Sequence, residues 1–202
     1  FALLSWYVGI LDKHISLKTD LDLSGVVLYP IGDLGPFTGV FDGNDNRISN
    51  AAINRPGGYY IGLFSYVGSS GQICNLGVEN VNMTGSIYVG GLIGYNSEGT
   101  ITACYATGAV AGSSNVGGLV GYSDSGTISS CYTTGAVTGS SSVGGLMGSS
   151  SDTISSCYAT GAVTGSSSVG GLVGDNRGSP ITACFWDMET SGHAGSYGGK
   201  GL

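Results

Sequence analysis

The chain has 202 residues, enough for one elongated domain with a buried core. It has 39 glycines and only 9% charged residues, yet 41% of its residues are hydrophobic, which excludes the composition of a disordered chain. The net charge is −7 and the six basic residues do not cluster, so nucleic acid is not an expected partner. No apolar run approaches the roughly 18 residues that cross a membrane, so membrane insertion is not expected either.

Residues 1–58 are predicted to form an N-terminal cap and the first coils of a repetitive fold. The opening FALLSWYVGIL is apolar but short and has no basic start, so we interpret it as a capping segment of the mature domain. The stretch from Ile15 to Leu23 alternates apolar and polar residues, which is typical of strands. The following PIGDLGPFTGVFDGNDNRISN is rich in turn residues, and no linker marks a second domain.

Residues 59–186 are dominated by a repeat of 26 to 27 residues. The tetrapeptide VGGL begins at Val89, Val116, Val143 and Val169, at spacings of 27, 27 and 26. A cysteine followed by an aromatic residue begins at Cys104, Cys131, Cys157 and Cys184, at spacings of 27, 26 and 27. Residues 187–202 are Gly-rich and are predicted to be a C-terminal cap or tail of the same continuous domain.

The composition of the repeat predicts a β-solenoid. Each copy has glycine at several positions, and glycine costs about 1 kcal/mol per helix-interior position relative to alanine. The Leu/Asn ladder of leucine-rich repeats is absent. Three short strands joined by Gly/Ser turns fit one coil, and successive coils stack about 4.8 Å apart. The fold class is therefore all-β, a parallel β-helix of about seven coils.

The irregular copy ICNLGVENVNM indicates which side chains point inward. Aligned with ITACYATGAV, it sets Leu76 on Cys104 and Val78 on Ala106. Cys104, Cys131, Cys157 and Cys184 are therefore predicted to form a core cysteine ladder. Neighbouring side chains on in-register parallel strands point the same way, about 4.8 Å apart, which is poor geometry for a disulfide. Buried free thiols are expected, with one strained bridge as the alternative; Cys74 falls outside the ladder.

Strand alternation then places a column of aromatic and threonine side chains on the outside. Its members are Tyr105, Thr107, Tyr132, Thr134, Tyr158, Thr160 and Phe185. The column either stabilises the solenoid by stacking, or is a binding strip for glycan rings, another protein or a sister subunit. Ice binding is disfavoured because most coils lack a Thr-x-Thr pair on this strand. Trp186 stands where Ala106 stands earlier, so it is expected to plug the end of the core.

Further inward positions are expected at the apolar residues of the VGGL tetrapeptides, with the glycine doublets at tight corners or close contacts. These positions are Val89, Leu92, Val116, Leu119, Val143, Leu146, Val169 and Leu172.

The repeat VGGL(I/V/M)G…TI…CYATG resembles the GLUG motif of secreted adhesin-like and haemagglutinin-like surface proteins. The flanking LDLSG, PFTGVFDGN and CFWDMETSG…GGKGL segments resemble those that surround such repeats. The resemblance covers nearly the whole chain and implies a secreted, right-handed β-helix. It implies little about activity, because the motif has no catalytic residues to transfer.

No constellation in the sequence predicts catalysis or a bound cofactor. Glu98, Asp124, Asp152 and Asp175 are scattered single acids, interpreted as solvated turn residues. Asp20 and Asp22 lie two apart and face either water or a structural calcium ion. His14 and His193 lie near opposite ends of the chain, and no metal site or catalytic residue is predicted.

The sequence thus predicts an extracellular structural or adhesive module at the cell surface rather than an enzyme. Its expected partners are itself, as a homo-oligomer or filament, or a cell-surface glycan or protein. A subunit of a self-assembling filament or surface layer is the first alternative. A polysaccharide-active β-helix enzyme is the second.

Overall fold

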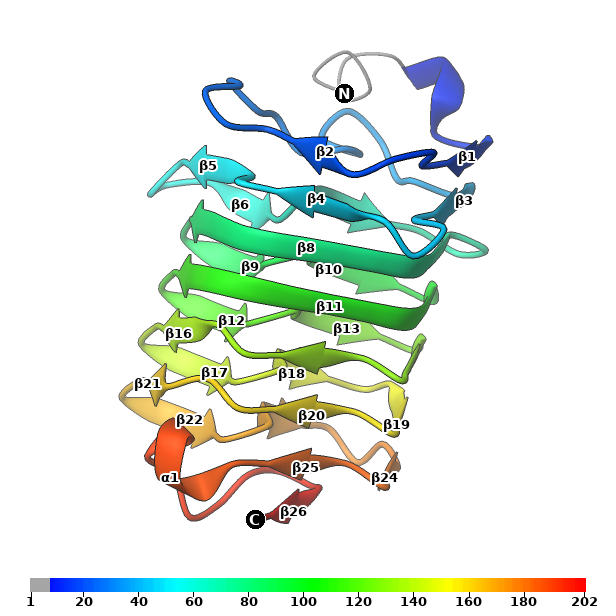
Figure 1. Ribbon diagram of the computed structural model, residues 1–202. Coiled ribbons are helices and arrows are strands. Elements are labelled where there is room, and N and C mark those ends of the chain that lie inside the picture. The colour runs from blue at the N-terminus through cyan, green and yellow to red at the C-terminus, as the bar shows by residue number, and fades with distance from the viewer. Residues whose placement is uncertain (1–7) are drawn as a thin grey trace.

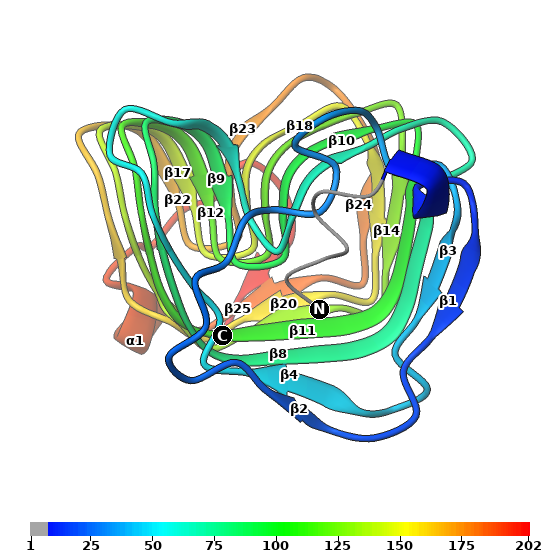
Figure 2. The ribbon, with the colours of Figure 1, turned by 90° about the horizontal axis from the view of Figure 1, so that it is seen from above.

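The computed structural model describes residues 8–202, which form a solenoid of stacked parallel strands (Figure 1). Seen from the N-terminal end, the chain turns clockwise as it recedes, so the helix is right-handed (Figure 2). The predicted parallel β-helix is confirmed. It has about six turns rather than seven, because the first and last coils contribute only short strands to one sheet.

The strands form three sheets, and the largest, here called the long sheet, has 16 strands. Its main path is β1 (His14–Ser16), β3 (Val40–Asp42), β8 (Gln72–Thr84), β11 (Thr100–Ala111), β15 (Tyr132–Thr133), β20 (Tyr158–Ala159), β25 (Phe185–Trp186) and β26 (Lys200–Gly201). Beside it lie β2 (Leu21–Asp22), β4 (Arg47–Ser49), β5 (Ala52–Asn54), β14 (Thr127–Ser129), β16 (Ala136–Thr138), β19 (Thr153–Ser155), β21 (Val163–Thr164) and β24 (Ile181–Thr182).

The other two sheets have five strands each. The β6–β22 sheet contains β6 (Tyr59–Ile61), β9 (Ile87–Gly90), β12 (Ser114–Gly117), β17 (Ser141–Gly144) and β22 (Ser167–Gly170). The β7–β23 sheet contains β7 (Phe64–Val67), β10 (Ile93–Ser97), β13 (Val120–Asp124), β18 (Met147–Ser150) and β23 (Val173–Asn176). A 3-10 turn, η1 (Val8–Ile10), and one short helix, α1 (Met188–Ser191), lie near the two ends.

Equivalent residues of successive coils pair with one another, so each column of the sequence repeat becomes a column in space. Tyr105 pairs with Tyr132, and Val116 pairs with Val143. The irregular copy keeps the predicted register, since Cys104 pairs with Leu76. The predicted inward residues of the VGGL segments are buried, except that Val169 is only partly buried against the core.

Aromatic rings fill the core at both ends. Near the N-terminus, the ring of Phe64 lies 5.3 Å from those of Phe37 and Phe41, centroid to centroid. At the other end Trp186 is buried and occupies the column of Ala159, which confirms the predicted plug. Its ring lies over Gly171, where an added Cβ would come within 2.0 Å of the indole.

The two short sheets bend inward and pack against each other, backbone on backbone (Figure 2). A Cβ on Gly121 would lie 2.4 Å from the backbone nitrogen of Val89, and one on Gly117 would lie 2.1 Å from the carbonyl oxygen of Val120. The doublet glycines do not adopt positive φ, so close approach rather than a tight turn explains them. The positive-φ column beside them holds Tyr60, Tyr88, Asn115, Ser142 and Ser168.

The segment after α1 covers the C-terminal edges of the sheets. The Ser196 hydroxyl accepts hydrogen bonds from the backbone nitrogens of Leu172 (3.2 Å) and Val173 (2.8 Å). Strand β26 pairs with β25 and closes the long sheet at that end. Within residues 8–202, no helix has the length and apolar character needed to cross a membrane.

Replacing Gly121 by alanine is expected to destabilise the protein strongly, because the new methyl group has no space between the short sheets. We expect a loss of about 3 kcal/mol or more in the free energy of unfolding, measured by urea denaturation. Gly57→Ala is the matched control, since nothing lies within 4 Å of a Cβ there. Equal stability of the two variants would contradict the backbone-on-backbone packing.

Candidate binding surface

A stack of three tyrosine rings runs down the outer face of the long sheet. Tyr105, Tyr132 and Tyr158 come from β11, β15 and β20, and successive ring centroids are 4.8 Å apart. The ring planes are within 7° and 1° of parallel. This spacing matches the distance between hydrogen-bonded strands, about 4.8 Å, so the solenoid itself holds the rings in contact. Tyr158 is exposed, whereas Tyr105 and Tyr132 are half-buried.

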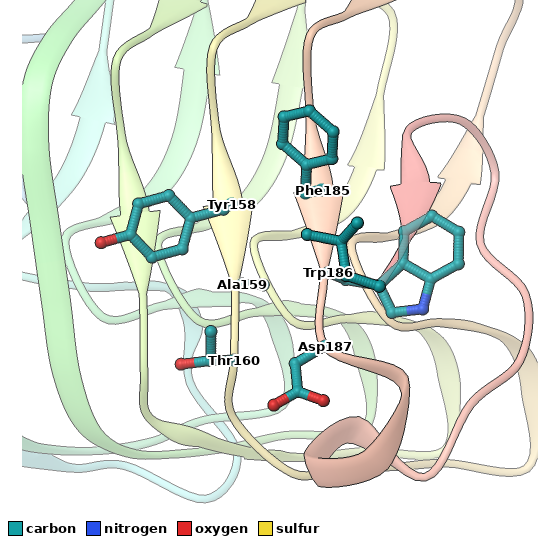
Figure 3. Close-up of a pocket in the computed structure, with 7 residues that line it drawn as sticks. Tyr158, Ala159, Thr160, Phe185, Trp186 and Asp187 are labelled. Carbon is teal, nitrogen blue, oxygen red and sulfur yellow. The ribbon is translucent and has the colours of Figure 1, made fainter.

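Most ring faces in the stack are already covered. Tyr132 has another tyrosine ring on each face. The ring of Tyr105 lies against Gly77, where an added Cβ would be 2.3 Å from its Cζ. Phe185 pairs with Tyr158 in register, but its ring turns away from the stack (Figure 3). Along the column, therefore, ring edges and hydroxyls are accessible, and one face of Tyr158 is open.

A series of ion pairs and a hydrogen bond links charged side chains to Tyr105, the first ring of the stack. The Tyr105 hydroxyl donates to Glu79 Oε1 at 2.7 Å, and Glu79 lies 3.7 Å from the Arg47 guanidinium. Arg47 also pairs with Asp20 at 3.1 Å. Burial, together with the hydrogen bond to Glu79, raises the pKa of Tyr105 well above its usual range. Its hydroxyl therefore stays protonated and is unsuited to act as a general base near neutral pH.

The three threonines of the predicted column lie on the same face in unequal surroundings. Thr107 Oγ1 accepts a hydrogen bond from the Asn80 backbone nitrogen at 3.0 Å. Thr134 is exposed, and Thr160 is half-buried with its carbonyl accepting from Thr190 Oγ1 at 2.7 Å. The threonines accordingly do not present a uniform array.

A pocket of about 310 Å³ opens where the tyrosine stack ends (Figure 3). It is lined by Tyr158, Ala159, Thr160, Phe185, Trp186, Asp187 and Leu202. Asp187 caps α1, and its Oδ1 accepts from the backbone nitrogens of Glu189 (2.9 Å) and Thr190 (3.2 Å). The hydrogen bonds from Thr190 and Glu189 lower the pKa of Asp187, so this carboxylate is charged beside an otherwise apolar wall.

The cysteine ladder is present as buried thiols, and all five cysteines of the chain are free. The sulfurs of Cys131, Cys157 and Cys184 each accept a hydrogen bond from the backbone of the preceding coil; for example, Cys104 N donates to Cys131 Sγ at 3.4 Å, and Cys131 N donates to Cys157 Sγ at 3.4 Å. Each thiol also donates to the carbonyl two residues earlier, as from Cys131 to Ser129 at 3.2 Å.

The sulfur thus completes the hydrogen bonding of a corner in which the preceding residue has positive φ, for example Ser130. Contact with the Cys131 thiol, followed by burial, raises the pKa of Cys157 to about 12. The pKa values of Cys131 and Cys184 are raised as well, so these three thiols are protonated at neutral pH and unsuited to nucleophilic chemistry.

One of the four scattered acids was wrongly interpreted as a solvated turn residue. Asp152 is completely buried, whereas Glu98 is exposed and Asp124 and Asp175 are half-buried. Its Oδ1 accepts from the Gly126 backbone nitrogen at 2.7 Å, and its Oδ2 accepts from the Ser123 hydroxyl. One coil earlier, Asn96 reaches the carbonyl of Gly99 itself (3.2 Å). Ser123 is too short to make the equivalent contact, so the Asp152 side chain fills the corner instead.

The first pair of acids, Asp20 and Asp22, lies among polar neighbours. Asp20 pairs with Arg47, and Asp22 Oδ1 accepts from Ser24 and from Asn50 Nδ2 at 2.8 Å. Within residues 8–202, no three His, Cys, Asp or Glu side chains are placed to hold a metal ion.

A second tyrosine cluster was missed by the sequence reasoning. Five rings from strands of the two short sheets contact one another; they belong to Tyr60, Tyr66, Tyr88, Tyr95 and Tyr122. Tyr95 and Tyr122 stack at 5.5 Å, and the Arg177 guanidinium covers Tyr122 at 5.3 Å. In later coils these columns hold serine, asparagine or aspartate, for example Ser149 and Asp175. The signal was the excess of tyrosine in the early, irregular copies.

The fold and the surface define a non-globular class of protein: a right-handed parallel β-helix with a stacked aromatic column on its outer face. Residues 78–111 and 112–138 match the model of the GLUG motif. The chain is therefore a GLUG-motif repeat protein.

Two curated relatives match part of the chain. Halomucin of Haloquadratum walsbyi is 39% identical over 110 residues, which is 50% of this chain and 1% of that protein. A protein of Evansella cellulosilytica named as a Gly-rich membrane protein is 36% identical over 94 residues, which is 45% of this chain and 11% of that protein. The chain thus matches only a small part of the length of either relative.

Among solved structures, a protein of Bacteroides ovatus named as an immunoglobulin A1 protease superposes with a TM-score of 0.69 at 24% identity. The superposition covers 87% of this chain and 57% of that one. At this identity the likeness shows the fold alone.

The buried carboxyl of Asp152 gives a prediction for pH dependence. Burial raises its pKa above the ordinary aspartate value, so the folded state holds this proton more tightly than the unfolded chain does. The contribution of Asp152 to the free energy of unfolding therefore falls as pH rises from the ordinary value through the raised pKa. Asp152→Asn should be more stable than the wild type at about pH 8, and the difference should vanish near pH 4.

Urea unfolding at both pH values measures this difference, and Asp45→Asn, at an exposed turn, is the control. A variant that is less stable than the wild type by the same amount at both pH values would show that the hydrogen bonds of Asp152 outweigh its burial.

The cysteine ladder gives a prediction for thiol accessibility. Alkylation of the native protein, followed by mass spectrometry, should label only Cys74, which is half-buried, while urea should expose all five thiols. Labelling of Cys74 should be slow, because burial raises its pKa. Cys74→Ser should abolish native-state labelling, and labelling of Cys131 at the rate of Cys74 would contradict the buried ladder.

Proposed function

We propose that this chain is an extracellular structural and adhesive module that attaches a surface to a glycan or a protein. The contact strip is the outward column Tyr105, Thr107, Tyr132, Thr134, Tyr158, Thr160 and Phe185. The observation that carries the proposal is the partly exposed stack of three tyrosine rings, held rigid by the coils beneath it. Rigid aromatic groups contribute large contact area at low entropic cost, which is why exposed aromatic columns favour recognition.

The names of the relatives support a location at the cell surface. The first relative is named halomucin, and the second is named as a Gly-rich membrane protein. The matches run over 110 and 94 residues at 39% and 36% identity, so segments similar to this chain occur in proteins with these names. We extend this location to the present chain as part of the proposal.

An enzymatic role receives less support from the arrangement of the acids. Asp20 and Glu79 both form ion pairs with Arg47, which lies between them. Hydrolysis of a glycosidic bond needs a protonated acid and a free carboxylate facing a cleft. The protease name of the structural neighbour does not transfer, because the likeness is one of fold.

Retention under flow tests the adhesive function directly. Cells of a non-adherent strain that display the chain should be retained on surfaces coated with polysaccharide or with protein. Tyr132→Ser should reduce retention several-fold, because it removes the central ring and both of its stacking contacts. Tyr59→Ser, which removes an exposed tyrosine from a different sheet, is the matched control and should leave retention unchanged.

Sedimentation of the purified chain over a concentration range separates adhesion from self-assembly. Retention only on surfaces coated with the chain itself, together with reversible growth in sedimentation, would replace adhesion by a filament or surface layer. Retention on none of the coatings would overturn the proposal. Thermal unfolding of each variant ensures that lost retention is not lost folding.

A further inference from the structure

We propose that the pocket at the C-terminal end of the tyrosine stack is a saccharide-binding site that takes one pyranose ring against the open face of Tyr158. This inference deepens the proposed adhesive function by naming the ligand class and the place where it binds. The pocket combines an open aromatic face and a second exposed ring, and Asp187 is among its lining residues (Figure 3).

The stack provides only one open ring face. Each interior ring covers its neighbour, and the far face of Tyr105 is closed by Gly77. Tyr158 is covered by Tyr132 on one side only. A pyranose ring presents apolar C–H groups on its faces, and these pack best against an uncovered aromatic face. Binding by stacking is therefore possible at the end of the column and impossible along its length.

The last coil leaves this face of Tyr158 open because Phe185 does not continue the tyrosine stack. Phe185 occupies the tyrosine column, but its ring does not continue the stack and remains exposed. Trp186, the next residue, turns into the core and donates its indole N–H to the His193 carbonyl at 3.0 Å. The space that a fourth stacked ring would occupy is thus part of the cavity.

Polar groups at the rim suit the hydroxyls of a sugar. Asp187 lines the pocket, and its Oδ1 caps α1 by accepting from the backbone nitrogens of Glu189 and Thr190. Figure 3 shows the side chains of Thr160 and Asp187 near one another on neighbouring coils. A charged acceptor beside an apolar wall is the usual composition of a small-ligand site, in which few polar groups orient the ligand.

The size of the cavity matches a single ring. Its volume of about 310 Å³ lies at the lower limit of small-molecule pockets, which span roughly 300 to 1,000 Å³. Its wall is shallow on the solvent side, so the remaining units of a longer glycan can extend along the outer face. We accordingly expect weak binding of a monosaccharide, with a Kd on the order of millimolar, and tighter binding of a multivalent glycan.

NMR titration of the ¹⁵N-labelled chain with methyl glycosides of glucose, galactose and mannose tests the site. At least one glycoside should shift the backbone signals of residues 158–160 and 185–187 in a saturable manner. Tyr158→Ser should weaken this binding about tenfold or more, since it removes the stacking face. Asp187→Asn should weaken it several-fold while α1 remains capped, because asparagine caps helices as well as aspartate does.

Tyr59→Ser, an exposed tyrosine far from the pocket, should bind as the wild type does. Unchanged binding by both Tyr158→Ser and Asp187→Asn would overturn the site, as would the absence of saturable shifts with all three glycosides. If wild-type cells are retained under flow while no glycoside binds, the saccharide site fails and the adhesive function stands. If a glycoside binds at these residues but displaying cells are not retained, the adhesive function fails and the site stands.

Discussion

The close approach of the two short sheets is the constraint on which the structure depends. Their backbones come so near that a single methyl group at Gly121 would overlap the backbone of Val89. Glycine at this position is therefore a requirement of packing, and it recurs at Gly94, Gly148 and Gly174 in other coils. The flanking Val and Leu residues then face the core from both sheets, which fills the interior although each coil is short. This contact accounts for part of the high glycine content of the chain.

In-register stacking makes every residue meet its own equivalent in the neighbouring coils. Tyrosine and cysteine gain from this arrangement, because rings stack at 4.8 Å and thiols accept hydrogen bonds from the preceding coil. Identical charges would repel at the same spacing. This explains why only 9% of residues are charged and why charged groups lie mainly at the ends or in pairs such as Arg47 and Glu79. Asp152 is buried only because Ser123 and Gly126 donate to it.

Features that repeat could be predicted from the sequence, and features that depend on departures from the repeat could not. The period sets the parallel register, and strand alternation sets which side Cys104 and Tyr105 face. The contact between the short sheets joins residues such as Val89 and Gly121, which belong to different coils and different sheets. Likewise, the burial of Asp152 depends on Ser123, which stands one coil away at the position where the coil before it has Asn96. No local pattern records such contacts.

The difference between regular coils and coils that depart from the repeat also affects where a solenoid binds a ligand. In a regular column the aromatic faces are buried against one another, because each ring of the tyrosine stack packs against the rings of the neighbouring coils. The regular coils consequently act as a rigid support, and their rings offer edges and hydroxyls. A face becomes available only where the repetition is broken, as at Phe185 and Trp186 in the last coil. Specific recognition in this fold is therefore favoured at irregular coils, and the number of regular coils sets how far such a site stands from the other end of the rod.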